Sequence, residues 1–398
     1  MKLFIAENNV TTQKKVVLDD MLLTKDMPTA AGSRMLDGYM SLFDAEIVEK
    51  LTSAGFGICG KANVGEFAID VMGETSYYGA NTDADGKLAL SAAEIVKSGK
   101  ADGAVVLDVN GSPRRGAAES GLVFVKPTYG TVSRYGTVPV ACSGETVGVM
   151  AKSVDGCKEL LSAIVGHDAK DGTSHAEELC RSLLNTDKKV KKVALVKAMT
   201  EKLDAEQTKK LDGFKSFLEE NGIEVCEIDG EILRSARIAW NILMCAELCN
   251  NVSRYDGIKY GYRSNNYTTI GELYTNSRTE AFGELLKTAI LFGSETLSTE
   301  NYMRMYDKAM RVRRVISEYF GELFAEYDAV LMPTASKAYT EDDVKNDKYI
   351  AFKENLYTAP ASITGLPTVV VGGVQLVGKA FSDGSLLEVA KMYEGGER

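Results

Sequence analysis

The sequence predicts an α/β protein. Strand-like apolar runs lie at 104–109, 121–125 and 147–151 among glycine-rich turns and short helical patches. Residues 192–228 have the pattern of a β-α-β unit. The 398 residues are 45% hydrophobic and 26% charged, which is typical of a folded globular chain and excludes a disordered, collagen-like or coiled-coil protein.

In the first half of the chain, residues 44–54 predict an amphipathic helix. Ile47, Val48 and Leu51 share one face, and Gly55 ends the helix. The sequence FGICG that follows predicts a buried strand.

The second half opens with the strand KVALV at 192–196. A helix then carries apolar residues on one face, stops at Gly222 and is followed by the strand IEVCEI. Residues 298–327 predict a long amphipathic helix with Ser298 or Thr299 as its N-cap. Strands are expected at 329–333 and 368–378. Because no composition break or proline-rich linker interrupts the chain, we expect a single domain over 1–398.

Charge and cysteine usage narrow the function classes. The 46 Lys and Arg against 56 Asp and Glu give a net charge of -10, so no general attraction to nucleic acid or anionic lipid is expected. No apolar run is long enough for a membrane span, and the apolar start is too short for a signal peptide. Seven scattered cysteines predict reduced thiols and a cytoplasmic protein. With only two histidines, a zinc site is not expected. No cofactor is expected.

Two catalytic motifs are weak. Gly55 to Ala62 nearly fits the phosphate-binding pattern G-x-x-x-x-G-K-[ST], but Ala62 offers no hydroxyl and the intervening residues are strand-like. Nucleotide binding is therefore a distant alternative. A serine-histidine-acid triad is not favoured because both histidines lie in the polar loop GHDAKDGTSH.

The segment 108–115 is the strongest catalytic candidate. Ser112 follows a glycine at the end of a predicted strand, where its hydroxyl would project into a cleft while the backbone N–H groups of Val109, Asn110 and Gly111 face a developing oxyanion. The four residues NGSP also form a common β-turn, so context must decide between the two interpretations.

That context is a family resemblance. The segment 122–174, which contains KPTYGTVSRYG, and the segment 251–263, which contains RYDGIKYGYR, resemble the amidase signature family, in particular its branch of amidotransferase A subunits. Further similar blocks follow in order from about Val16 to Glu394. The resemblance implies a mixed sheet wrapped by helices, with the family's N-terminal helical segment missing, and a Ser-cisSer-Lys triad that hydrolyses amides.

The match is poor at the positions that the resemblance makes catalytic. The family's G-S-D-T-G-G-S-I-R corresponds to residues 106–114 and keeps the nucleophile as Ser112. Its G-G-S-S-G-G-S loop corresponds to 85–91, where both candidate bridging serines are replaced and Lys87 takes one of the positions. Its catalytic lysine corresponds to Leu18, which cannot accept a proton.

Two further residues follow from the resemblance. Arg313 corresponds to the arginine that holds the substrate carboxylate, and Asn355 stands where the family has an aspartate that holds the substrate ammonium. Half of the amino-acid clamp is therefore expected to survive. A structural ion pair is the alternative role for Arg313.

These observations predict an amidase-like protein that has lost amide hydrolysis. It would bind a small carboxylate or amide ligand, or partner subunits like those of the amidotransferase, without binding nucleic acid directly. The alternative is an active amidase or glutaminase subunit that uses Ser112 with a rearranged base such as Lys87, buried enough to lower its pKa.

Overall fold

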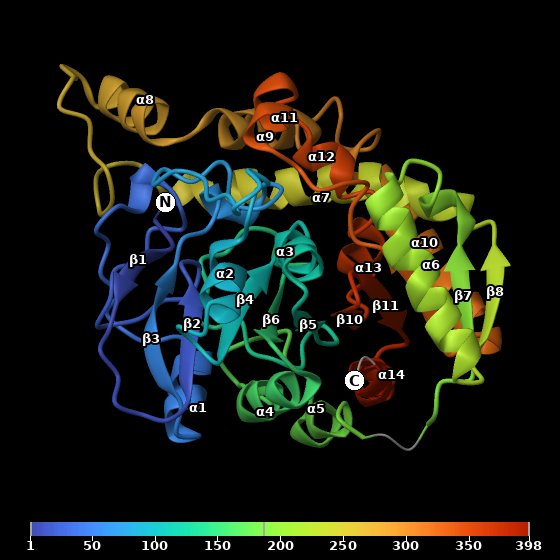
Figure 1. Ribbon diagram of the computed structural model, residues 1–398. Coiled ribbons are helices and arrows are strands. Elements are labelled where there is room, and N and C mark those ends of the chain that lie inside the picture. Colours follow the sequence, from blue (N-terminus) through green and yellow to red (C-terminus); the bar gives the residue numbers. More distant parts are fainter. Residues whose placement is uncertain (1, 186–187, 397–398) are drawn as a thin grey trace.

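One eleven-stranded mixed sheet runs through the computed structural model, which describes residues 2–185 and 188–396 (Figure 1). The strand order is β1-β3-β2-β4-β6-β5-β10-β11-β9-β7-β8. Strands β2 and β3, β2 and β4, and β7 and its two neighbours pair in parallel, and the other pairs are antiparallel. The strands are β1 Phe4–Glu7, β2 Lys15–Asp19, β3 Gly57–Ala62, β4 Gly103–Asp108, β5 Val123–Lys126, β6 Thr146–Ala151, β7 Lys192–Val196, β8 Glu224–Ile228, β9 Ala329–Pro333, β10 Thr368–Val371 and β11 Val374–Gly378.

Helices cover both faces of this sheet. They are α1 Glu46–Ser53, α2 Ser91–Lys97, α3 Ser112–Ser120, α4 Val154–Ile164, α5 Glu177–Ser182, α6 Ala205–Glu220, α7 Ser235–Asn251, α8 Ile270–Ala281, α9 Glu284–Thr296, α10 Tyr306–Glu326, α11 Glu341–Asn346, α12 Ala351–Glu354, α13 Ala359–Thr364 and α14 Asp383–Gly396. In Figure 1, α7 lies across one end of the strands, with α8, α9, α11 and α12 beyond it.

Alternation along β4 divides the core into two layers. Val105 and Leu107 belong to the larger hydrophobic cluster, whereas Ala104 and Val106 belong to a smaller cluster that α2 and α3 cover. Successive side chains of a strand point to opposite faces, and all six residues of β4 are buried. Strand β4 is therefore a central strand, and it positions the loop in front of α3.

Most predicted elements are confirmed. Strands β3 to β9, helices α1 and α6, and the parallel pairing of β7 with β8 lie where the hydrophobic pattern places them, and 368–378 forms the hairpin β10–β11. The structure adds β1 and β2, which the pattern did not predict.

The predicted start of the long helix is wrong. Helix α10 begins at Tyr306, and the residues before it form turns in which the amide of Tyr302 donates to the carbonyl of Ser298. The side chain of Asn301 donates to Glu295 and Ser298, and such side-chain bonds compete with helical ones. Ser298 and Thr299 are therefore not N-caps of α10.

Candidate active site around Ser112

Ser112 is the first residue of α3 and follows a three-residue loop after β4. Gly111 has φ +86°, and a Cβ there would lie 2.4 Å from the Thr358 side chain. Only glycine therefore fits this close, left-handed turn. Ser112 is 2% exposed, and its hydroxyl has no hydrogen-bond partner among residues 2–185 and 188–396.

The predicted oxyanion donors lie in this loop, and the N–H group of one of them, Gly111, already donates to a side chain. The N–H of Gly111 donates to Asp108 Oδ1 at 3.0 Å. Val109 is buried in the hydrophobic core, and Asn110 presents its carbonyl oxygen to Arg115 Nη2 at 2.8 Å. The Gly111 N–H is thus engaged by an internal carboxylate, and oxyanion binding by the loop stays a prediction.

Arg115 brings a buried positive charge beside the loop. Its guanidinium donates to the carbonyls of Asn110, Val71 and Asp70 at 2.8, 3.1 and 3.3 Å. Burial lowers its pKa. All three acceptors are neutral backbone carbonyls. Arg115 therefore links the 109–111 loop to residues 70–71 through hydrogen bonds.

Two acids, Asp70 and Glu74, belong to the segment that Arg115 contacts. Asp70 accepts from the backbone of Gly73 and Thr75, and Glu74 accepts from the N–H groups of Val71 and Met72. Burial raises the pKa of both, to about 8 for Glu74. Their acceptor atoms are used within the same turn, where they order the loop, and neither carboxylate is hydrogen-bonded to Ser112 in the part of the chain that the structure describes.

Position 18, which the resemblance assigns to the catalytic lysine, lies inside the sheet. Leu18 is fully buried on β2 and pairs in register with Lys61 on β3. The Lys61 ammonium donates to Thr29 Oγ1 at 2.8 Å and to the carbonyl of Leu22, and it lies 3.7 Å from Asp20 Oδ1. Burial lowers its pKa. Lys61 is therefore part of a structural ion pair with Asp20. Residues 57–62 form the buried strand β3 and not a phosphate-binding loop.

Lys87 faces a different partner. Its ammonium lies 3.1 Å from Glu206 Oε2 on α6, and 35% of its side chain is exposed. The hydrogen bond to Glu206 raises its pKa. A Ser112–Lys87 dyad needs contact with the serine and a lowered pKa, and this arrangement favours neither. The base role of Lys87 stays a prediction without geometric support.

The two clamp residues occupy separate environments. Arg313 on α10 donates to the carbonyl of Ser143 at 2.9 Å, and no ion pair to it occurs among the described residues. Asn355 is fully buried and donates to Asn110 Oδ1 at 3.0 Å and to Asn241 Oδ1 at 2.6 Å. The fold thus brings Asn355 to the nucleophile loop but gives it no shared contact with Arg313.

Sequence reasoning missed several polar residues of this site. Asp108 and Arg114 form a buried ion pair at 2.7 Å behind the loop, and Arg115 donates to the loop carbonyl of Asn110. Hydrogen bonds also join three asparagines in a chain, Asn110, Asn355 and Asn241. Two adjacent arginines shortly after a predicted apolar strand that ends with an aspartate, as in VLDVNGSPRR, are the signal that could have identified Arg114 and Arg115.

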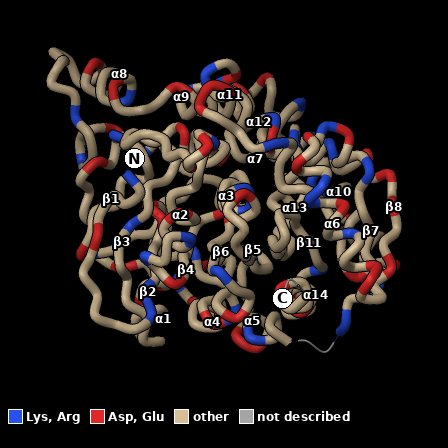
Figure 2. Tube along the Cα trace, viewed as in Figure 1, with Lys and Arg blue, Asp and Glu red and all other residues tan. Residues whose placement is uncertain are grey.

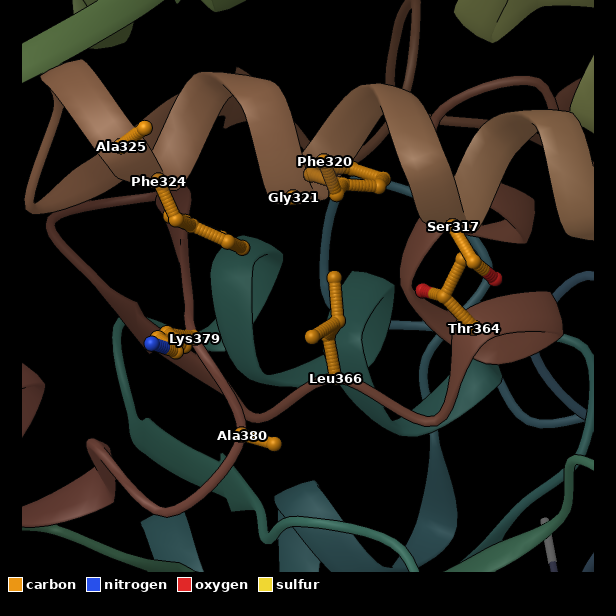
Figure 3. Close-up of a pocket in the computed structure, with 9 residues that line it drawn as sticks. All are labelled: Ser317, Phe320, Gly321, Phe324, Ala325, Thr364, Leu366, Lys379 and Ala380. Atoms are coloured by element: carbon orange, nitrogen blue, oxygen red, sulfur yellow. The ribbon is translucent and has the colours of Figure 1, made fainter.

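A surface cavity of about 350 Å³ lies elsewhere, between α10 and the segment 364–380. In Figure 3, Phe324 extends from α10 toward the facing loop, and Leu366 points from that loop toward the helix. None of the predicted site residues lines it. Over residues 2–185 and 188–396, no group of three or more His, Cys, Asp or Glu is placed to hold a metal ion, and no helix is long and apolar enough to cross a membrane.

Comparison with known proteins agrees with this architecture. The family model "Amidase" matches residues 16–387. The A subunit of glutamyl-tRNA(Gln) amidotransferase from Acinetobacter baumannii is 35% identical over 94% of this chain and 80% of its own length, and that of Streptococcus pneumoniae is 34% identical over 98% and 84%.

Solved structures show the same fold. The A subunit of glutamyl-tRNA(Gln) amidotransferase from Thermotoga maritima superposes with a TM-score of 0.81 at 28% identity, covering 99% of this chain and 87% of that one. Allophanate hydrolase of Kluyveromyces lactis, at 21% identity and a TM-score of 0.79 over 96% of this chain and 61% of that one, shares the fold. The mixed sheet, the serine at the start of α3 and the match over 16–387 together establish that the chain belongs to the amidase family.

Proposed function

We propose that this chain is an amidase-family protein, similar to the amidotransferase A subunits, that does not hydrolyse amides and works by binding a partner or a small ligand. One observation carries the proposal: the Ser112 hydroxyl has no proton acceptor bonded to it among the described residues. Leu18 is apolar, and the amines of Lys61 and Lys87 are engaged with other groups.

The size of the expected loss follows from the missing base. A serine hydroxyl is a weak nucleophile unless an adjacent group accepts its proton. Losing a general base costs about 10²- to 10⁴-fold in rate, and losing residues that act as a unit costs up to about 10⁶-fold. Turnover should therefore fall to the background rate of the assay.

A second candidate is an active enzyme component that hydrolyses an amide. It is favoured by the relatives, which are named as A subunits of glutamyl-tRNA(Gln) amidotransferase at 34–35% identity. For this function, Lys87 would have to leave Glu206 and reach Ser112.

Ammonia release decides between the two candidates. Glutamine, asparagine and an aromatic amide are tested with the wild type, Ser112→Ala and Ser120→Ala, the last being a matched serine at the other end of α3. The proposal expects no difference among the three proteins. Turnover that Ser112→Ala abolishes and Ser120→Ala leaves intact would overturn it.

A restoration experiment addresses the base directly. Leu18→Lys introduces the amine that the family resemblance places there, but it does so next to the buried Lys61 in register on β3. The bridging serines remain absent, so we expect no recovery of hydrolysis. Recovery by this single change would show that the 85–91 loop still completes the site.

For partners, we propose that the chain binds subunits like those implied by the relatives' names and works in the cytoplasm. Figure 2 shows acidic and basic residues interspersed along the trace. With the net charge of -10, this distribution supports partner-mediated rather than direct contact with RNA. Size-exclusion chromatography with the other subunits of a relative's enzyme tests this, and no co-elution would count against it.

A further inference from the structure

A second cavity lies next to the asparagine chain. It has a volume of about 310 Å³ and lies between α7, α9 and α12. Its lining is Asn241, Cys245, Thr288, Phe292, Tyr349 and Phe352. None of these residues belongs to the predicted catalytic set.

The lining is uncharged and largely aromatic. Phe292, Tyr349 and Phe352 contribute rings from three segments, and burial raises the pKa of the Cys245 thiol to about 12, so the thiol is neutral at physiological pH. At the neighbouring surface, Lys348 and Glu284 pair at 2.8 Å and neutralise each other. Phe292 and Tyr349 are 38% and 45% exposed, so the cavity opens to solvent, and a charged ligand would lose part of its hydration here without gaining an opposite charge.

Asn241 supplies the polar contact. Its Nδ2 donates to the carbonyl of Phe352 at 2.9 Å, and its Oδ1 accepts from Asn355 at 2.6 Å. A side-chain amide has two N–H groups and two lone pairs on oxygen, so one donor and one acceptor of Asn241 have no partner among the described residues. Both can serve a hydroxyl group of a ligand.

We propose that this cavity binds a small neutral aromatic molecule that carries one hydroxyl group, with its ring among Phe292, Tyr349 and Phe352 and its hydroxyl on Asn241. The volume and the apolar lining are those of a small-ligand pocket. The site is joined to the Ser112 loop through Asn355 and Asn110. It does not depend on whether the chain hydrolyses amides.

The test uses 3-phenylpropanol and its charged counterparts 3-phenylpropanoate and 3-phenylpropylammonium, which share the carbon skeleton. Calorimetry is expected to give one site with a millimolar Kd for the alcohol, as for ligands of this size, and at least about tenfold weaker binding of both ions. Equal binding of an ion, or no binding of the alcohol to the folded protein, would overturn the proposal.

Variants locate the site. Phe292→Ala removes one ring and should weaken binding of the alcohol by about three- to tenfold, and Thr288→Phe fills the cavity and should abolish binding. Leu291→Ala is the matched control, because Leu291 neighbours Phe292 on α9, is 71% exposed and does not line the cavity. Unchanged binding in folded Thr288→Phe, or equal weakening by Leu291→Ala, would place the ligand elsewhere and overturn the assignment.

Arg313→Ala should leave binding of the alcohol unchanged, which separates this cavity from any carboxylate site at Arg313.

Discussion

Replacing Asn355 by aspartate tests the chain of hydrogen bonds that joins Asn110, Asn355 and Asn241. The amide of Asn355 donates to Asn110 Oδ1 and to Asn241 Oδ1, 3.0 and 2.6 Å away. Rotating either partner's amide to turn an N–H donor toward position 355 would break another hydrogen bond. Asn110 Nδ2 donates to the carbonyl of Ile69, and Asn241 Nδ2 donates to that of Phe352. A carboxylate at position 355 would therefore face two oxygen acceptors inside the core.

The cost can be worked from these contacts. In the Asn355→Asp variant, a protonated carboxyl group offers one O–H donor, so it keeps one of the two hydrogen bonds, and losing the other costs about 1–3 kcal/mol. An ionised carboxylate loses both and is buried without a partner, so its pKa must rise above the ordinary value of about 3.9. The folded state then binds the proton more tightly, and stability falls with rising pH by about 1.4 kcal/mol per unit between about pH 4 and the raised pKa.

Urea unfolding from pH 5 to pH 8, followed by the fluorescence of the single tryptophan, Trp240, measures this effect. Asn355→Ala removes both bonds without adding a charge and should destabilise equally at every pH. Asn265→Asp, in an exposed loop, should change the unfolding free energy by less than about 0.5 kcal/mol. If Asn355→Asp matched the wild type at pH 8, or lost stability without a pH dependence, the three-asparagine chain would be refuted.

Three further outcomes are expected. Burial raises the pKa of Asp19 from 3.8 to about 7, so the folded protein binds this proton more tightly than the unfolded chain does. In urea unfolding, the stability of the wild type relative to Asp19→Asn should be highest below about pH 4 and should fall by roughly 4 kcal/mol as pH rises to about 7. A difference that stays constant with pH would contradict this. If Arg313 and Asn355 bind a ligand as the resemblance implies, calorimetry should show weaker binding of glutamine than of its des-amino analogue, by about ten- to a hundredfold, because Asn355 stands where the resemblance implies an ammonium-binding aspartate. Tighter glutamine binding, or an unchanged Arg313→Ala variant, would refute it. Direct tRNA binding by the isolated chain should be weak and lost with modest salt in a filter-binding assay, whereas tight, salt-resistant binding would contradict the charge argument.

The sequence alone determined the class of the fold and most of its elements. Central strands such as β4 are fully buried, so they read as continuous apolar runs, and α6 shows a helical apolar stripe ended by Gly222. These signals are local and strong. The short edge strand β1 and the turns at 298–305 lack such a signal, because tertiary pairing and side-chain bonds determine them.

For the site, the sequence determined the residue types: the serine at 112 and the apolar side chain at 18 are visible in the chain itself. Only the tertiary structure decided the partners. Lys87 lies with Glu206 from another part of the chain, Lys61 with Asp20 and Thr29, and Asn355 with Asn110 and Asn241. The physical reason is that a pKa or a hydrogen bond depends on which groups lie within about 3–4 Å and on how much water is excluded, and both depend on contacts between residues far apart in the sequence.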